Sequence, residues 1–138
     1  MPSLRPTQNL PSALPQLQPV LMKTASDPRH LKRIQLFKAL FSTGFDSKDK
    51  IPSLIQPIFD HLSSIDKLIT QHAPEWPIAK LNKVDLAILR LAIYELTIEK
   101  KNPPKVIIDE AIELAKKFGT DKTSKFVNGV LGAVLNQK

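Results

Sequence analysis

The sequence predicts an all-α protein, in which a single domain folds as a bundle of about five helices behind a proline-rich N-terminal leader. After residue 27, apolar residues recur three and four positions apart along most of the chain, and no stretch alternates apolar and polar residues as a strand would. The 138 residues are enough for one hydrophobic core and too few for two. We therefore expect one folded domain over residues 28–138.

Residues 1–27 are predicted to form a flexible leader. Six of the 12 prolines lie in the first 28 residues, five of them before Pro28. Proline interrupts a helix because it lacks a backbone N–H and because its ring clashes with a preceding carbonyl group. Met22, close to the end of this segment, is a candidate for the natural start of the protein.

The first predicted helix begins with Asp27 as its cap and Pro28 in its first turn, and Gly44 is its expected end. One long helix is expected over residues 52–73, with Pro57 delaying or kinking its start. The buried side of the first helix is expected to consist of Leu31, Ile34, Phe37 and Phe41.

The third predicted helix, residues 83–100, is apolar nearly all round. A helix of this kind is buried on every side, so we expect it to be the central helix of the bundle. Asn82 and Asp85 stand at its start in an arrangement that resembles a capping box.

Two more helices complete the predicted bundle. The fourth is expected over residues 105–118, with Gly119 as its end, and Thr123 or Ser124 is expected to cap the last. The predicted buried stripe of the last helix consists of Phe126, Val127, Val130, Leu131 and Val134.

Composition excludes several kinds of site. The chain has no cysteine, which rules out disulfides, thiolate metal sites and a cysteine nucleophile. Its three histidines are not spaced as metal ligands, and its four glycines form no phosphate-binding loop, so we expect neither metal nor cofactor, and no enzyme. No apolar run is long enough for a membrane span and no signal peptide is recognisable, which favours a cytoplasmic protein.

Basic residues are in excess: 20 Lys and Arg against 13 Asp and Glu give a net charge of +7, which favours polyanionic partners. One group shares an arc of about 100° on the first predicted helix and consists of Arg29, Lys32 and Arg33. Another lies around the start of the last helix, next to Phe126, and includes Lys122 and Lys125. Cations and an aromatic ring at a helix start suit a phosphate backbone with an unstacked base. A merely solvated charged surface, with Phe126 in the core, stays open as the alternative.

Two long segments resemble the NusB family: residues 81–96, LNKVDLAILRLAIYEL, and residues 109–130, DEAIELAKKFGTDKTSKFVNGV. Residues 30–41, HLKRIQLFKALF, are similar to the basic first helix of that family, and the resemblance extends over residues 28–135. It implies an all-helical domain that binds the boxA element of ribosomal RNA leader transcripts together with the ribosomal protein NusE. The pair helps to load a complex onto RNA polymerase that resists premature termination.

The resemblance also assigns roles to residues. An acidic residue at the head of the central helix faces NusE in the family, which points to Asp85, with helix capping alone as the alternative reading. Arg90 is expected to be structural, because a buried Arg needs internal partners. The resemblance implies that RNA is bound by Arg29, Lys32, Arg33, Lys122, Lys125 and Phe126.

The sequence departs from the family pattern near the first helix. The family usually has more arginines there and a further helix before the long second one, whereas only residues 42–50 separate the two here. Two alternatives follow: an adaptor that keeps the fold without RNA binding, and a detached accessory domain of a ribosomal RNA methyltransferase. Whether the chain forms a homodimer is left open.

Overall fold

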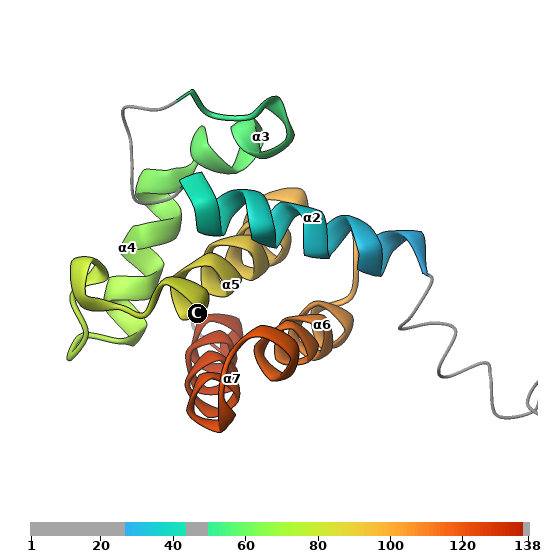
Figure 1. Cartoon of the computed structure of the whole chain (residues 1–138). Helices are drawn as coiled ribbons and strands as arrows, with labels where there is room; N and C mark the ends of the chain where they lie inside the picture. The colour runs from blue at the N-terminus through green and yellow to red at the C-terminus, as the bar shows by residue number, and fades with distance from the viewer. Residues whose placement is uncertain (1–26, 44–49, 137–138) are drawn as a thin grey trace, which may run out of the picture. The chain divides into compact units, whose positions relative to one another are not determined.

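The computed structural model describes residues 27–43 and 50–136. Within these ranges the regular elements are all helical, and no strand occurs. In chain order they are α2 (Pro28–Thr43), the 3-10 turn η3 (Ser53–Ile55), α3 (Gln56–Phe59), α4 (Leu62–His72), the 3-10 turn η4 (Ile78–Lys80), α5 (Lys83–Tyr94), the π-helical segment η5 (Glu95–Glu99), α6 (Pro104–Phe118) and α7 (Asp121–Asn136) (Figure 1). The chain divides into two units, Met1–Arg33 and Ile34–Lys138, which are described separately.

The described part of the first unit, residues 27–33, is the beginning of α2. The Arg29 backbone N–H donates to Asp27 Oδ1 over 2.8 Å, and this contact lowers the pKa of the Asp27 carboxyl. Asp27 therefore caps α2 and Pro28 opens it, as predicted. Leu31 is 45% exposed, so its predicted place on a buried side is wrong. The leader and Met22 lie outside the described residues.

Helix α5 occupies the centre of the second unit, with α4, α6 and α7 packed against it (Figure 1). Every residue from Leu86 to Ile93 is buried, which confirms the prediction of a central helix that is apolar on all sides. The surrounding helices contribute buried side chains that include Ile65, Ile69, Ile107, Leu114, Val127 and Leu131.

The second half of α2 joins this core through Phe37 and Leu40. The Phe37 ring stacks on Phe118 of α6 with 4.8 Å between centroids. Phe41 is 40% exposed, contrary to prediction, because the next residue along a helix is rotated by about 100° from Leu40, which faces inward. Gly44, the predicted end of the helix, lies outside the described residues.

The expectation of one helix over residues 52–73 is wrong. The chain instead forms η3, α3 and α4, and the interruption lies at Asp60 and His61, where His61 has φ −116° and ψ 17°. Pro57 sits in the first turn of α3, where a missing N–H costs no hydrogen bond. The pattern of buried residues nevertheless keeps its helical spacing through the break, because Ile58, Ile65 and Ile69 all face the core.

The third and fourth predicted helices agree closely with the structure. Asn82 caps α5, since its Oδ1 accepts from the backbone N–H of Val84 at 2.8 Å and of Asp85 at 3.4 Å. The last five residues before Lys100 are π-helical, which apolar spacing did not predict, and Lys100 ends the segment in the left-handed conformation with φ 55°. Helix α6 ends at Gly119 as predicted. No helix in the described ranges has the length and apolar content needed to cross a membrane.

Candidate nucleic-acid interface

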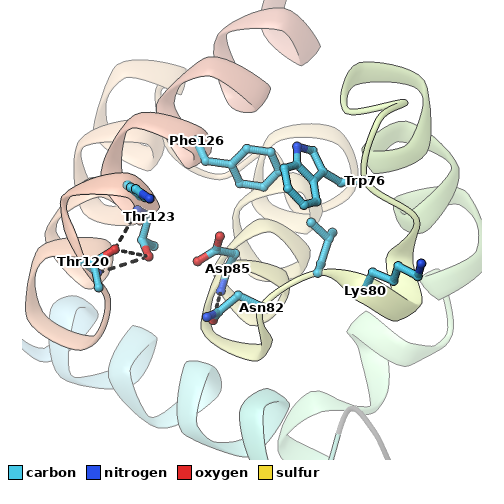
Figure 2. A pocket seen from close by; sticks show the side chains of 9 residues that line it. Trp76, Lys80, Asn82, Asp85, Thr120, Thr123 and Phe126 are labelled. Atoms are coloured by element: carbon cyan, nitrogen blue, oxygen red, sulfur yellow. Dashed lines mark hydrogen bonds between the residues drawn. The ribbon is translucent and has the colours of Figure 1, made fainter.

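A pocket of about 480 Å³ opens between the start of α5, the start of α7 and the loop before η4 (Figure 2). Its walls bring together residues from three parts of the second unit. Those that carry chemistry are Trp76, Lys80, Asp85, Lys122, Thr123 and Phe126.

The start of α7 forms one wall, and it differs from the prediction. The helix begins at Asp121, and its cap is Thr120 in place of the expected Thr123 or Ser124. Thr120 and Thr123 bond reciprocally: the Thr123 N–H lies 3.4 Å from Thr120 Oγ1, and the Thr120 N–H donates to Thr123 Oγ1 at 3.2 Å. Gly119 permits this turn, because a Cβ there would lie 2.6 Å from Thr123 Oγ1.

Asp85 stands three residues after the cap of α5, and Figure 2 shows its carboxylate pointing into the pocket. The expectation that Asp85 takes part in capping is not met, since Asn82 makes the cap and Asp85 Oδ1 is buried without a hydrogen-bond partner in the described chain. Burial raises the pKa of the Asp85 carboxyl, and the nearby Thr123 hydroxyl offsets part of that rise. The predicted contact of Asp85 with a protein partner stays a prediction.

Trp76 and Phe126 form the aromatic part of the site. Trp76, the single tryptophan of the chain, is 52% exposed, while Phe126 is half-buried and packs against the core. Both residues also line a second hollow of about 290 Å³, together with His72 and Lys125. Phe126 therefore fits both of the readings left open by the sequence. Trp76 was not singled out from the sequence, because an aromatic residue in a loop belongs to no periodic pattern.

The two α7 lysines that were expected to bind RNA are both exposed. Lys122 lines the larger pocket together with Lys80, and Lys125 lines the smaller one, so the aromatic pair stands between two hollows that each hold one of the two α7 lysines. Neither lysine forms an ion pair within the described residues, which leaves both charges available to a ligand. The structure thus brings Lys122, Lys125 and Phe126 together, as predicted.

The basic residues of α2 agree only partly with the prediction. Arg29 and Lys32 are exposed, and Arg29 Nε lies 3.6 Å from Asp27 Oδ1. Arg33 is 7% exposed, so the expectation of three cations on one exposed face is wrong for this residue. Helical spacing places side chains around an axis and says nothing about how much of each is covered. Whether these residues share a surface with the α7 lysines stays a prediction.

Arg90 has the structural role expected of it. Its Nε and Nη2 donate to the two carboxylate oxygens of Asp66 over 3.0 and 2.9 Å, which joins α5 to α4. The Arg90 side chain is 7% exposed and that of Asp66 is 24% exposed. The pair holds α4 in place, and the loop that carries Trp76 follows directly after α4.

A model of the NusB family matches residues 45–136. The transcription antitermination protein NusB of Thermotoga maritima is 38% identical over 136 residues, which span 84% of this chain and 94% of that protein. The protein of the same name from Chloroflexus aggregans is 44% identical over 94 residues, and the chain spans 63% of its length.

A solved structure of T. maritima NusB superimposes with a TM-score of 0.74 at 37% sequence identity, and the match covers 80% of this chain and 92% of that one. The stretch of this chain that aligns with the T. maritima sequence, 84% of 138 residues, is shorter than the 136 aligned positions. The T. maritima protein therefore has residues without a counterpart in the aligned part of this chain.

Proposed function

Because this chain belongs to the NusB family, we propose that it is a transcription antitermination factor that binds boxA-type single-stranded RNA of ribosomal RNA leader transcripts together with the ribosomal protein NusE. It acts by stoichiometric binding in a cytoplasmic complex with RNA polymerase, and it catalyses no reaction. The family match over residues 45–136 carries the proposal, because it includes the whole central helix and the start of α7.

Charge and aromatic surface support the RNA contact. Lys122 and Lys125 neutralise phosphates, while the exposed Trp76 and the half-buried Phe126 receive unstacked bases. Arg29 and Lys32 add phosphate contacts from α2. Arg33 stays in the proposal as a residue of the same helix, although its low exposure makes it a poor position for a test.

NusE is the proposed protein partner, and Asp85 is its contact by resemblance to the family. A carboxylate at a helix start is compatible with a basic partner protein. Self-association of the chain would compete with such a partner if both used one surface, so its oligomeric state is part of the test.

Titration of boxA RNA followed by fluorescence anisotropy, with and without NusE, tests the proposal. About four neutralised phosphates give a slope of log affinity against log salt near −3, at about 0.7 per phosphate for a single strand. Replacing Lys122 and Lys125 by Ala lowers the magnitude of the slope by about 1.4. Replacing the exposed Lys101 and Lys105 removes the same charge elsewhere and serves as the control.

A flat salt response, or equal effects of the two double variants, contradicts the proposed RNA surface. The α2 contacts are tested separately by replacing Arg29 and Lys32 with Ala, which weakens binding to every RNA sequence alike if they contact phosphates. Binding of NusE without any binding of RNA supports the adaptor alternative instead.

A further inference from the structure

Two lysines from different helices converge on the ring of Phe118. Lys38 Nζ, from α2, lies 5.9 Å from the ring centre, and Lys117 Nζ, from α6, lies 5.7 Å from it. Both lysines are exposed, and neither forms an ion pair with a residue in the described ranges. Phe37 stacks on the ring with 4.8 Å between centroids, and all four residues belong to the second unit. The group of Lys38, Lys117 and Phe118 is called the Phe118 patch below.

The fold accounts for only one of these two lysines. Lys117 lies in the last turn of α6, where a cation is stabilised by the negative end of the helix dipole. Lys38 lies more than a turn from either end of α2 and has no such role. The ring attracts each ammonium group, but two like charges that are drawn to one ring repel each other. An anion bound between them would remove this repulsion.

The position of the patch favours an RNA phosphate as that anion. Phe118 is the last residue of α6, and Lys122 of α7 follows four residues later, so their Cα atoms lie within about 15 Å of each other. The turn between the two helices is tight, because a Cβ at Gly119 would lie 2.6 Å from Thr123 Oγ1. The patch therefore borders the α7 lysines that are proposed to bind RNA, and one strand of several nucleotides can contact both.

The patch also offsets a departure of this chain from its family. The first helix has fewer arginines than the family pattern, and one of them, Arg33, is only 7% exposed. Lys38, in the second half of the same helix, and Lys117 add two exposed positive charges at a different place. A long-range attraction to a polyanion depends on the number and exposure of such charges, so the loss at the start of α2 is compensated by the patch.

We propose that the Phe118 patch is an additional RNA contact, in which Lys38 and Lys117 together hold one phosphate of the strand that lies along the α7 lysines. The inference rests on the RNA binding proposed above. It goes further, because the family resemblance assigns no role to these three residues. The Phe118 ring keeps the two ammonium groups near each other, so that both can donate hydrogen bonds to one phosphate. A phosphate contact carries no sequence information, so the patch adds affinity for every RNA sequence alike.

Chemical footprinting tests the contact on the unaltered full chain. The protein is treated briefly with acetic anhydride, with and without a saturating amount of boxA RNA, and the acetylated lysines are located by mass spectrometry. RNA should protect Lys38 and Lys117 about as strongly as it protects the two α7 lysines of the proposed RNA surface. Lys67, which is exposed on α4 and lies outside the patch, should stay reactive in both samples.

The salt dependence of binding then counts the phosphates. Because the two lysines share one phosphate, Lys38→Gln/Lys117→Gln should lower the magnitude of the slope of log affinity against log salt by about 0.7. It should also weaken binding roughly two- to fivefold at physiological salt. Lys67→Gln/Lys116→Gln removes the same charge from the same kind of exposed helical position and should leave the slope unchanged. Thermal melts of both double variants establish that they are folded.

Four outcomes decide against the inference. If Lys38 and Lys117 stay reactive in the RNA complex, or if the two double variants have equal effects, the patch is not an RNA contact, although the proposed function stands while the α7 lysines are protected. If no RNA binds at all, both proposals fail. A fall of the slope by about 1.4 means that the two lysines hold separate phosphates. If oligoglutamate protects them and RNA does not, the patch binds an acidic protein segment instead.

Discussion

The ion pair between Asp66 and Arg90 predicts an unequal response to removal of its two partners. Both guanidinium–carboxylate hydrogen bonds are short, at 2.9 and 3.0 Å, and the two side chains differ in exposure, with 7% for Arg90 and 24% for Asp66. Asp66→Ala leaves a positive charge buried without a partner. Arg90→Met leaves a carboxylate that water still reaches.

The magnitudes follow from that difference. Leaving a buried charge unpaired costs about 3–5 kcal/mol of unfolding free energy, so Asp66→Ala should lower the midpoint of thermal unfolding by about 12–20 °C in a domain of this size. Arg90→Met loses hydrogen bonds to a charged group that can be rehydrated, which costs about 1.5–3 kcal/mol. The double variant Asp66→Leu/Arg90→Met should be close to the parent, because apolar replacement of a buried pair is often neutral.

Urea unfolding followed by far-UV circular dichroism measures these free energies. Lys105→Ala is the matched control, because it breaks an exposed ion pair with Asp109 whose side chains are 86% and 61% exposed, and its effect should stay below about 0.5 kcal/mol. Equal losses of under about 1 kcal/mol from Asp66→Ala and Arg90→Met would mean that solvent screens the pair, and the burial argument would be wrong.

Three other substitutions test the two helix starts around the pocket. Asn82→Ala removes the cap of α5 and should cost about 1 kcal/mol in urea unfolding. Gly119→Ala places a Cβ 2.6 Å from buried Thr123 and should cost about 1–3 kcal/mol. Asp85→Asn should raise the thermal midpoint at neutral pH, with a gain that disappears below the ordinary carboxyl pKa of 3.8, because burial raises the pKa of Asp85 in the folded state.

The sign for Asp85 follows from proton linkage. A folded state with the higher pKa binds the proton more readily, so the parent chain is favoured below the unfolded pKa and loses that advantage as pH rises through the folded pKa. Asn carries no charge and has no such dependence. A gain from Asp85→Asn that is independent of pH would contradict the burial of the charge, and a gain from Asn82→Ala or Gly119→Ala would contradict the packing at the two helix starts.

Sequence patterns predicted the parts of this fold that depend on local chemistry or on continuous periodicity. The central helix, the Asn82 cap and the end of α6 at Gly119 were all predicted from the sequence, because each depends on residues close together in the chain. The break at His61 was not predicted, because the buried residues Ile58 and Ile65 keep a helical spacing across it. The spacing of apolar residues indicates which residues face the core. A turn that leaves the same residues facing the core does not change this spacing, so the spacing cannot reveal the turn.

In the candidate site, too, the residues set by local sequence were predicted and those set by packing between distant segments were not. Lys122, Lys125 and Phe126 were predicted because they follow one another on a single helix. Trp76 was missed because its place beside Phe126 depends on how the loop after α4 packs near α7, a contact between residues far apart in the chain. The burial of Arg33 was missed for a related reason, since exposure is a property of the folded molecule and not of helical spacing.

Stability and binding make opposite demands on Asp85. The same burial that disfavours its charge removes water from Oδ1, and a hydrogen bond formed there with a ligand is stronger than one formed in solvent. If the carboxylate served only the fold, an amide of the same shape would be the better residue, and Asp85→Asn would stabilise the chain at no cost to binding. A variant that gains stability at neutral pH and loses affinity for NusE would show that the cost to the fold is retained for recognition.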